Sequence, residues 1–453
     1  MPNILLVAIN AKWIHPALSL RLLKANLGSY ESQAEILEFA LRQPVTEQAD
    51  LIIEARPRIL GISVSIWNHK ATAELLQILD KAWRKDAAPK PAVILGGPEA
   101  SHLPAEADLF QYADWIIRGE GEQAFRELCG TVLDGLPAPP LKITAAPPAE
   151  LAELDPGYRL YTDEDLRRKL IYVEASRGCP FGCEFCLSSR SGLREFPLDS
   201  FLKEMDVLIR RGAKAFKFLD RSFNLNIPRA RRILEFFLER LVPPQYVHFE
   251  MIPSRFPLEL RQTVSAFPPG TLRLELGIQT FNPVTAELIG RQSDPEKELE
   301  VLRFLSEKTN AIVHTDLIAG LPAEDISSFA AGFDRLWQAG PTEIQVGILK
   351  CLPGTPLNRH TASQQMRYAL EPPYEVSETG ALSRPELDRI KNFARFWEII
   401  VNRGAFGGFS DALFPRRQGV FSRFMDLSDR LLRRFGRNWG IPQQDLGKAL
   451  ESG

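Results

Sequence analysis

Six apolar runs rich in β-forming residues recur through the middle of the chain, and this repeat restricts its fold more than any other feature. The runs cover residues 171–176, 215–219, 246–252, 272–278, 311–318 and 343–350. Each gap between them is long enough for a helix, so the pattern predicts alternating strands and helices. Parallel strands of this kind are buried on both faces and curve toward a barrel. Six units predict a partial (β/α)6 barrel, not a complete eightfold one.

Polar residues lie within or just after these runs, where such a barrel collects its functional groups at the C-terminal ends of its strands. They are Asp220, Arg221, Ser222, Asn224, Glu250, Ser254, Arg255, Glu275, Gln279, Thr280, His314, Asp316, Lys350 and Cys351. Taken singly, each of these residues is more often a loop residue with its hydrogen bonds satisfied than one that binds a ligand. Six strand ends that meet at one opening of the barrel nevertheless predict a binding site there. Glu250, Glu275 and Asp316 are candidates for cofactor binding or for acid–base catalysis there, and the sequence does not divide these roles among them. Cys351 could reach a substrate with its thiol, or could be a packed residue before the next turn.

Three cysteines, Cys179, Cys183 and Cys186, lie in the stretch Arg-Gly-Cys-Pro-Phe-Gly-Cys-Glu-Phe-Cys after the first of these strands. Thiolates at this spacing can bind three irons of a [4Fe–4S] cluster and leave the fourth iron open to a substrate or cofactor. A structural zinc site would need a fourth ligand, and neither Cys129 nor Cys351 is near enough in sequence to supply it. With only those two cysteines left over, a second cluster is not expected.

The cysteine run resembles the C-x3-C-x2-C signature of the radical S-adenosylmethionine (radical SAM) superfamily, with the aromatic Phe185 before its last cysteine. Three further stretches resemble elements of that superfamily: Phe-Leu-Asp-Arg-Ser-Phe-Asn at 218–224, Leu-Glu-Leu-Gly-Ile-Gln-Thr-Phe-Asn at 274–282 and His-Thr-Asp-Leu-Ile-Ala-Gly-Leu-Pro at 314–322. The resemblance implies that SAM binds the open iron and is cleaved to a 5′-deoxyadenosyl radical. The residues it implies for SAM binding are Phe185, Asp220, Arg221, Glu275, Gln279, Asp316 and Gly320.

The N-terminal third has a second strand–helix pattern. Its apolar runs cover residues 3–9, 34–39, 58–66, 92–96 and 114–117, between helical stretches such as 16–28 and 70–85. This pattern predicts a five-stranded, doubly wound, Rossmann-like α/β domain that binds its ligand at the C-terminal strand ends. The candidate binding residues there are Asn10, His15, Ser63, Ser65, Trp67, Asn68, Gly96, Gly97, Glu99, Gly119 and Gly121. Paired glycines would let the backbone approach a large flat ligand, although such a domain alone does not specify which one.

Joined to the barrel, the stretches Ser-Val-Ser, Leu-Gly-Gly-Pro-Glu and Arg-Gly-Glu-Gly-Glu resemble the cobalamin-binding radical SAM class. The opening Asn-Ala-Lys-Trp-Ile-His-Pro-Ala-Leu-Ser-Leu resembles an uncharacterised subgroup with a C-terminal domain of unknown function. The resemblance implies cobalamin in addition to the cluster and SAM. Because the Asp-x-His-x-x-Gly motif of methyl-carrying cobalamin domains is absent from the sequence, we expect His15 to be a packing or helix-entry residue, not a cobalt ligand. Base-off cobalamin, with Trp67 and Asn68 facing the lower side of the corrin, is the expected arrangement.

The predicted order is a cobalamin-binding domain at 1–135, a proline- and alanine-rich linker at 136–165, the barrel at 166–365 and a small helical C-terminal domain at 366–453. Ser383, followed by Arg-Pro-Glu, predicts the start of a helix in the last region. The N-terminus indicates a strand and not a signal peptide, and no stretch approaches the ~18 apolar residues of a membrane span. Five cysteines and a reduced cluster favour the cytoplasm. The formal net charge of −2 argues against nucleic acid as a partner.

The resemblance implies that the protein is an enzyme, and methyl transfer is the first activity that it implies. In that mechanism the deoxyadenosyl radical takes a hydrogen from a small molecule or peptide, and methyl passes from methylcobalamin to the carbon radical. A second SAM would remethylate the cobalamin, and flavodoxin or ferredoxin would supply electrons. The same cofactors could instead support a rearrangement, ring formation or a redox reaction. A cobalamin-binding sensor that has lost turnover is the alternative from a different class, and the intact cysteines argue against it.

Overall fold

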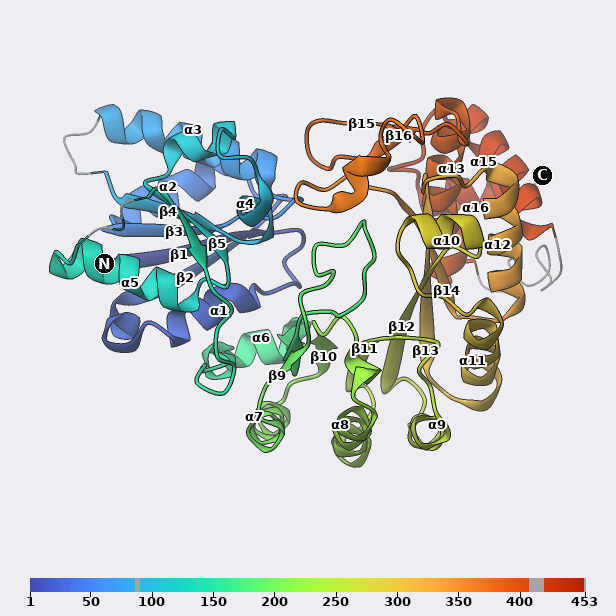
Figure 1. Ribbon diagram of the computed structural model, residues 1–453, viewed down its shortest axis with the longest axis horizontal. Coiled ribbons are helices and arrows are strands. Elements are labelled where there is room, and N and C mark those ends of the chain that lie inside the picture. The colour runs from blue at the N-terminus through green and yellow to red at the C-terminus, as the bar shows by residue number, and fades with distance from the viewer. Residues whose placement is uncertain (86–89, 138, 140, 407–418, 452–453) are drawn as a thin grey trace. The chain divides into compact units, whose positions relative to one another are not determined.

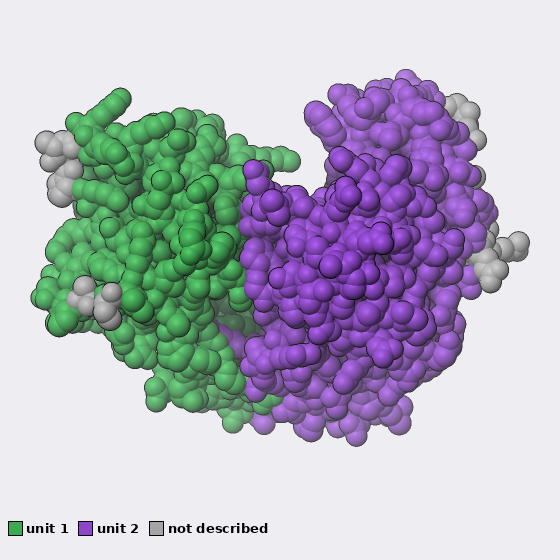
Figure 2. Space-filling view, turned by 45° about the horizontal axis from the view of Figure 1, so that its top comes forward, with its two compact units in different colours: residues 1–175, 194–219 green, residues 176–193, 220–453 purple. Residues whose placement is uncertain are grey.

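The computed structural model (Figure 1) describes the chain except for residues 86–89, 138, 140, 407–418 and 452–453. Contacts divide it into two compact units, which Figure 2 shows in different colours. The first unit comprises residues 1–175 and 194–219, and the second comprises residues 176–193 and 220–453. The segment 176–193, which carries the three cysteines, therefore packs with the second unit.

The N-terminal sheet is parallel, and its strand order is β2-β1-β3-β4-β5-β6. The strands are β1 (Ile4–Asn10), β2 (Ala34–Ala40), β3 (Ile59–Ser63), β4 (Ala92–Gly96), β5 (Trp115–Gly119) and β6 (Ile143–Ala146). The order reverses between β1 and β3, as a doubly wound sheet requires. Ligands of such sheets bind beyond the C-terminal strand ends near this switch point.

Helices cover both faces of this sheet, and each face has its own hydrophobic core (Figure 1). The helices are α1 (Leu18–Ala25), α2 (Val45–Ala55), α3 (His69–Lys85), α4 (Pro98–His102) and α5 (Glu122–Asp134). Strand β1 contributes to both cores, with Leu5 and Val7 in one and Leu6 and Ala8 in the other. Its uninterrupted apolar run follows from this burial on two faces.

The predicted linker contains regular structure that the sequence did not indicate. Strand β6 lies within residues 136–165 and pairs in parallel with β5, so the sheet has six strands and not the five predicted. Helix α6 (Asp163–Arg168) closes the same segment with a capping box between Thr162 and Asp165. The run Ile-Thr-Ala-Ala of β6 is too short and too poor in large apolar residues to reveal a strand that only edge pairing stabilises.

The second sheet confirms the predicted repeat, because each of the six apolar runs contains one strand. These strands are β7 (Ile171–Val173), β10 (Ala215–Phe218), β11 (Tyr246–Met251), β12 (Leu272–Gln279), β13 (Ile312–Ala319) and β14 (Glu343–Ile348). Strand β10 pairs with β7 in the first unit, and β11 to β14 pair in chain order in the second, all in parallel. The connecting helices are α7 (Leu198–Arg210), α8 (Ile227–Arg240), α9 (Leu258–Ser265), α10 (Pro283–Leu288), α11 (Pro295–Lys308) and α12 (Ile326–Gln338).

The barrel strands of the second unit are buried alternately, which differs from the expectation of two apolar faces. In β12, Leu274 and Leu276 are fully buried, whereas Glu275 and Gly277 on the other face are half-buried. Strands β11 and β13 alternate in the same way. The sheet therefore has one apolar face and one face that carries its polar residues.

The region after the barrel is not wholly helical. A short antiparallel pair, β15 (Arg367–Tyr368) and β16 (Val376–Glu378), precedes the helices. The helices are α13 (Arg384–Trp397), the π-helical turn η6 (Glu398–Asn402), α15 (Val420–Phe435) and α16 (Gln443–Glu451). Ser383 caps α13 through a capping box with Glu386, as predicted. Three short elements bear on the site: β8 (Ser176–Arg177), β9 (Arg194–Glu195) and the 3-10 helix η5 (Pro356–His360).

Candidate active site

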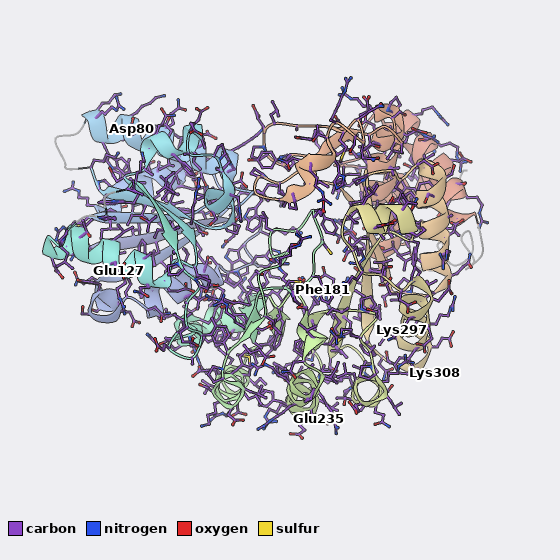
Figure 3. All side chains as sticks on the ribbon, viewed as in Figure 1. Asp80, Glu127, Phe181, Glu235, Lys297 and Lys308 are labelled. Atoms are coloured by element: carbon purple, nitrogen blue, oxygen red, sulfur yellow. The ribbon has the colours of Figure 1, made fainter. Side chains whose placement is uncertain are left out.

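The cysteine loop between β8 and β9 is closed on itself by hydrogen bonds; Figure 3 labels its Phe181. The Cys179 amide donates to Ser191 Oγ at 3.0 Å, and the Ser191 amide donates to the Cys179 carbonyl at 3.1 Å. Further around the loop, the Arg190 amide donates to the Phe181 carbonyl at 2.9 Å. These bonds fix the loop backbone near the first cysteine through the protein's own contacts.

A cavity of about 220 Å³ in the second unit opens beside the cysteines. Ten of the residues predicted from sequence line it: Cys179, Cys183, Cys186, Phe185, Arg221, Glu250, Ser254, Glu275, Gln279 and Asp316. They come from the cysteine loop and from positions within or just after successive strands. The structure thus brings together the cysteine motif and the polar strand ends, which are far apart in the sequence.

Three other predicted residues lie outside the lining of this cavity. Asp220 is buried and accepts a hydrogen bond from Ser176 Oγ at 2.5 Å. Gly320 has a φ of +88° and packs beside Val376, so its conformation explains the glycine. Cys351 is buried, and burial raises the pKa of its thiol. A packing role therefore fits Cys351 better than the catalytic role predicted for it.

The cavity also contains two residues that no sequence pattern indicated, Arg291 and Glu298. Arg291 donates to the Gly277 carbonyl, and its guanidinium lies 3.8 Å from Glu298. The charge of Arg291 also lowers the pKa of the Cys183 thiol against the effect of burial. Burial raises the pKa of Glu298, and Arg291 partly opposes this shift. Both residues come from the α10–α11 region and not from a strand end. A search restricted to strand ends could not have found them.

Three side-chain pairs span the polar face of the sheet: Arg221–Glu250 at 3.5 Å, His248–Glu275 at 3.1 Å and His314–Glu343 at 2.8 Å, of which the two histidine pairs are ion pairs when the imidazole is protonated. The strand register sets Glu250, Glu275, His314 and Glu343 in one row. The two histidine rings also stack, with centroids 5.6 Å apart. Glu250 and Glu275 are therefore held at the cavity by basic partners, an arrangement suited to binding polar groups or moving protons.

The cysteines fit a cubane cluster. Burial raises the pKa values of the Cys179 and Cys183 thiols, and basic side chains oppose this shift, Arg221 at the first and Arg291 at the second. Within the described part of the chain, no three His, Cys, Asp or Glu side chains are placed to hold one metal ion. A cubane does not require that placement, because each thiolate binds a different iron.

Glu324 is a buried acid close to the cavity. Thr280, which follows the cavity residue Gln279, donates its hydroxyl to Glu324 Oε1 at 2.6 Å. The other carboxyl oxygen has no hydrogen-bond partner among the described residues. Burial raises the pKa of Glu324 from 4.5 to about 7. The folded state therefore holds this proton more tightly than the unfolded state.

The Glu324→Gln substitution is expected to stabilise the protein at neutral to alkaline pH and to have no such effect in acid. Below pH 4.5 the carboxyl is neutral in both states, and as pH rises through about 7 the folded state loses stability. The shift corresponds to ~3 kcal/mol above pH 7, which glutamine would recover. Thermal unfolding measured from about pH 5 to pH 8 tests this prediction. Glu239→Gln, at an exposed glutamate, is the control. If Glu324→Gln differed from wild type in thermal stability by the same amount at about pH 5 and at about pH 8, the raised pKa of Glu324 would be contradicted.

Two predicted glycines of the N-terminal domain are needed by the protein's own backbone. Gly97 has a φ of +98°, and a Cβ there would lie 2.6 Å from the Val64 carbonyl oxygen. Gly119 has a φ of +96°, and its Cβ would lie 2.6 Å from the carbonyl oxygen of Ala146. The close approach that these glycines permit is therefore between neighbouring segments of this domain. It does not require a ligand.

Two polar residues predicted to face the cobalamin are engaged within the domain. The Asn68 amide oxygen accepts from the Ser65 amide at 2.8 Å, and its nitrogen donates to the Ser63 carbonyl at 3.0 Å. The Glu99 carboxylate lies 2.8 Å from His69 Nδ1. Both side chains are buried. Through these contacts both side chains shape the strand-end loops.

Exposed aromatic surface lies at the same strand ends. Trp67, after β3, is 53% exposed, and Trp13, after β1, is 49% exposed. Large exposed apolar side chains of this kind mark interaction sites, and a flat macrocycle is one ligand that fits them. Trp67 and Trp13 therefore leave apolar surface exposed at this edge of the sheet.

His15 is tied to the domain by one ring nitrogen. Its Nδ1 lies 2.9 Å from the Tyr172 hydroxyl, and the two rings stack with centroids 6.0 Å apart. Burial lowers the pKa of His15 below its usual value of 6.5, with a further contribution from Lys12. These contacts agree with the packing role predicted for this residue.

Two family models match the chain in the predicted order. The B12 binding domain matches residues 4–129, and the radical SAM superfamily matches residues 173–336. The chain carries a B12 binding domain followed by a radical SAM domain. Together these two domains imply a [4Fe–4S] cluster, SAM and cobalamin, which are the three predicted cofactors. No helix among the described residues is long and apolar enough to cross a membrane.

Two curated relatives are similar to this radical SAM protein over most of its length. The cobalamin-dependent radical SAM methyltransferase TokK of Streptomyces tokunonensis is 28% identical, over 70% of this chain and 50% of TokK. The 2-(S-pantetheinyl)-carbapenam-3-carboxylate methyltransferase of Streptantibioticus cattleyicolor is 27% identical, over 67% of this chain and 48% of that protein. The chain spans about half the length of these curated relatives.

Solved structures of cobalamin-dependent radical SAM proteins share the fold. The enzyme OxsB superposes with a TM-score of 0.69 at 15% identity, covering 96% of this chain and 71% of OxsB. The methyltransferase TsrM of Kitasatospora setae superposes with a TM-score of 0.62 at 18% identity, covering 82% of this chain and 79% of TsrM. These likenesses confirm the predicted architecture of a Rossmann-like domain followed by a radical SAM barrel.

Proposed function

We propose that this protein is a cobalamin-dependent radical SAM methyltransferase that acts on a small molecule or peptide. The cavity carries the proposal, because it joins the three cysteines to polar residues from several strands. Two relatives whose names describe methyltransferases support methyl transfer as the reaction. A rearrangement, ring formation or redox reaction with the same cofactors is the alternative.

Each part of the site has a proposed role. Cys179, Cys183 and Cys186 bind the cluster, and Phe185 packs beside it. Arg221, Gln279 and Asp316 line the cavity and contact SAM, while Asp220 and Gly320 support it from outside the lining. When bound, these cofactors supply radical chemistry and a transferable methyl group. Glu250 and Glu275 orient the substrate and hold or release a proton at their carboxylates.

Cobalamin is proposed to bind at the C-terminal edge of the N-terminal sheet. Trp67 provides exposed apolar surface there, and Asn10, Ser63, Ser65, Gly96 and Gly121 belong to the same strand-end loops. His15 is not the cobalt ligand in this proposal, because the sequence lacks the Asp-x-His-x-x-Gly motif of the domains that use one. Flavodoxin or ferredoxin is the proposed reductant, and the cytoplasm is the proposed compartment.

Metal counts and isotope transfer test the function. Protein purified anaerobically with cobalamin supplied is expected to contain about four irons and one cobalamin per chain. SAM labelled in its methyl group should then transfer the label to a product when candidate substrates are supplied. Product without label would favour the rearrangement or redox alternative. Failure to form 5′-deoxyadenosine or S-adenosylhomocysteine with any reductant or substrate would favour a sensor.

The Cys179→Ala, Cys183→Ala double variant is expected to lose nearly all cluster iron, because two of its three protein ligands are gone. Iron and sulfide analysis after anaerobic reconstitution measures the effect. Cys129→Ala is the matched control, because Cys129 is a buried residue of α5 whose pKa is raised to about 12 by burial. Unchanged iron in the double variant would refute the cluster site.

A further inference from the structure

A carboxylate is buried inside the cysteine loop itself. Glu184 lies between Cys183 and Phe185, and only 1% of its surface is exposed. A buried carboxylate is costly unless it is paired and hydrogen-bonded, so its partners are part of what holds the loop in place. The cubane ligation of the neighbouring cysteines does not require an acid at this position.

The partners of Glu184 come from η5, well beyond the barrel in sequence. His360 Nε2 donates to Glu184 Oε2 at 2.8 Å, and Arg359 forms an ion pair with Oε1. His360 is itself buried, whereas the Arg359 side chain is 59% exposed. Each carboxylate oxygen therefore has a basic partner from one short segment.

The other side of the loop is held by the turn after α10. The Glu184 amide donates to the Ile289 carbonyl at 2.9 Å. Gly290 has a φ of +64°, and a Cβ there would lie 2.7 Å from the Gly182 carbonyl oxygen. Backbone contacts thus fix the loop from one side, and the side chain of Glu184 fixes it from the other.

We propose that His360 and Arg359 are positioning residues of the cluster site and act through Glu184. They hold the Cys183–Cys186 turn in its ligating conformation, and the charges of Glu184 and Arg359 act on the reduction potential of the cluster. The segment 356–360 lies outside the matched superfamily region at 173–336, so the inference extends the cluster site into the C-terminal part of the chain. It rests on the proposed placement of the cluster at the three cysteines.

The first measurement is the rate at which a chelator removes iron from the reconstituted holoprotein. Glu184→Ala and His360→Ala are expected to release iron about tenfold faster than wild type, the lower end of the effect of losing a supporting hydrogen bond at a metal site. Asp429→Ala is the matched control, because it breaks the Arg389–Asp429 ion pair of the C-terminal helices. Its release rate should equal that of wild type.

The second measurement is the cluster midpoint potential, obtained by EPR-monitored titration. Glu184→Gln removes a negative charge beside the cluster and should raise the potential, whereas Arg359→Gln removes a positive charge and should lower it. A purely structural role would not produce shifts of opposite sign. Release rates within twofold of wild type, or two shifts of the same sign, would overturn the inference. Retention of iron by the Cys179→Ala, Cys183→Ala variant would instead overturn the proposed cluster site.

Discussion

Replacing Gly178 with alanine is expected to abolish stable cluster binding while the rest of the protein stays folded. Gly178 precedes Cys179 and has a φ of +94°, a region that L-residues with a Cβ rarely adopt. A Cβ at this position would lie 1.7 Å from the Gly192 carbonyl oxygen, far inside van der Waals contact. The two ends of the cysteine loop would have to separate. The Cys179–Ser191 hydrogen bonds that close the loop would then be lost.

Iron analysis and visible absorption of the reconstituted protein measure this loss, and we expect less than about a quarter of the wild-type iron. Gly192→Ala is the matched control. Its φ is +68°, but among the described residues no atom outside its chain neighbours lies within 4 Å of the added Cβ. That variant should keep its cluster and lose only ~1 kcal/mol from backbone strain. If the two variants contained equal amounts of iron after reconstitution, the cysteine loop could open without losing the cluster.

Strand positions in the barrel could be predicted because their buried positions are occupied by large apolar residues. Strand β12 is the clearest case, since Leu272, Leu274, Leu276 and Ile278 are all fully buried. Strand β6 could not be predicted in the same way. Its Ile143–Ala146 run is only half-buried at the edge of the sheet, and its stability comes from pairing with β5. The periodicity of apolar residues in a sequence indicates which residues are buried. It does not indicate a strand that is stabilised mainly by backbone hydrogen bonds to its neighbour.

In the candidate site, too, some residues were predictable from sequence and others depend on contacts that form only in the folded chain. The cysteine motif and the strand-end acids were predictable because chain order and parallel topology place them at one mouth. Arg291 and Glu184 were not, since neither lies at a strand end. Their roles depend on contacts with Cys183 and His360 that only the folded chain creates. The contacts of Asn68 were not predictable for the same reason, because its amide bonds to loop backbone groups that only the folded chain brings near.

A buried charge network in the N-terminal unit supports the largest stability effect that we expect. Arg21 is 3% exposed and lies 2.9 Å from Glu38 Oε2 and 3.1 Å from Asp165 Oδ2. Lys169 approaches the same two carboxylates at 3.8 and 2.8 Å. Glu38 also accepts from the Asn10 side chain at 3.2 Å. The network therefore joins the core of the domain to the strand-end loop proposed to bind cobalamin.

The Arg21→Met substitution is expected to destabilise this unit by ~3–5 kcal/mol, because it leaves two buried carboxylates with one lysine. Hydrogen exchange of the β1 and β2 amides measures the loss where it arises, since unfolding of a chain with two units need not be a single transition. Arg159→Met is the control. Its partners are Glu31 and Asp155, and because the Arg159 side chain is 48% exposed the cost should stay below ~1 kcal/mol. Because Glu38 also holds Asn10, Arg21→Met should weaken cobalamin binding as well, and Arg159→Met should not. Equal effects of the two variants on exchange would mean that Lys169 alone satisfies both acids.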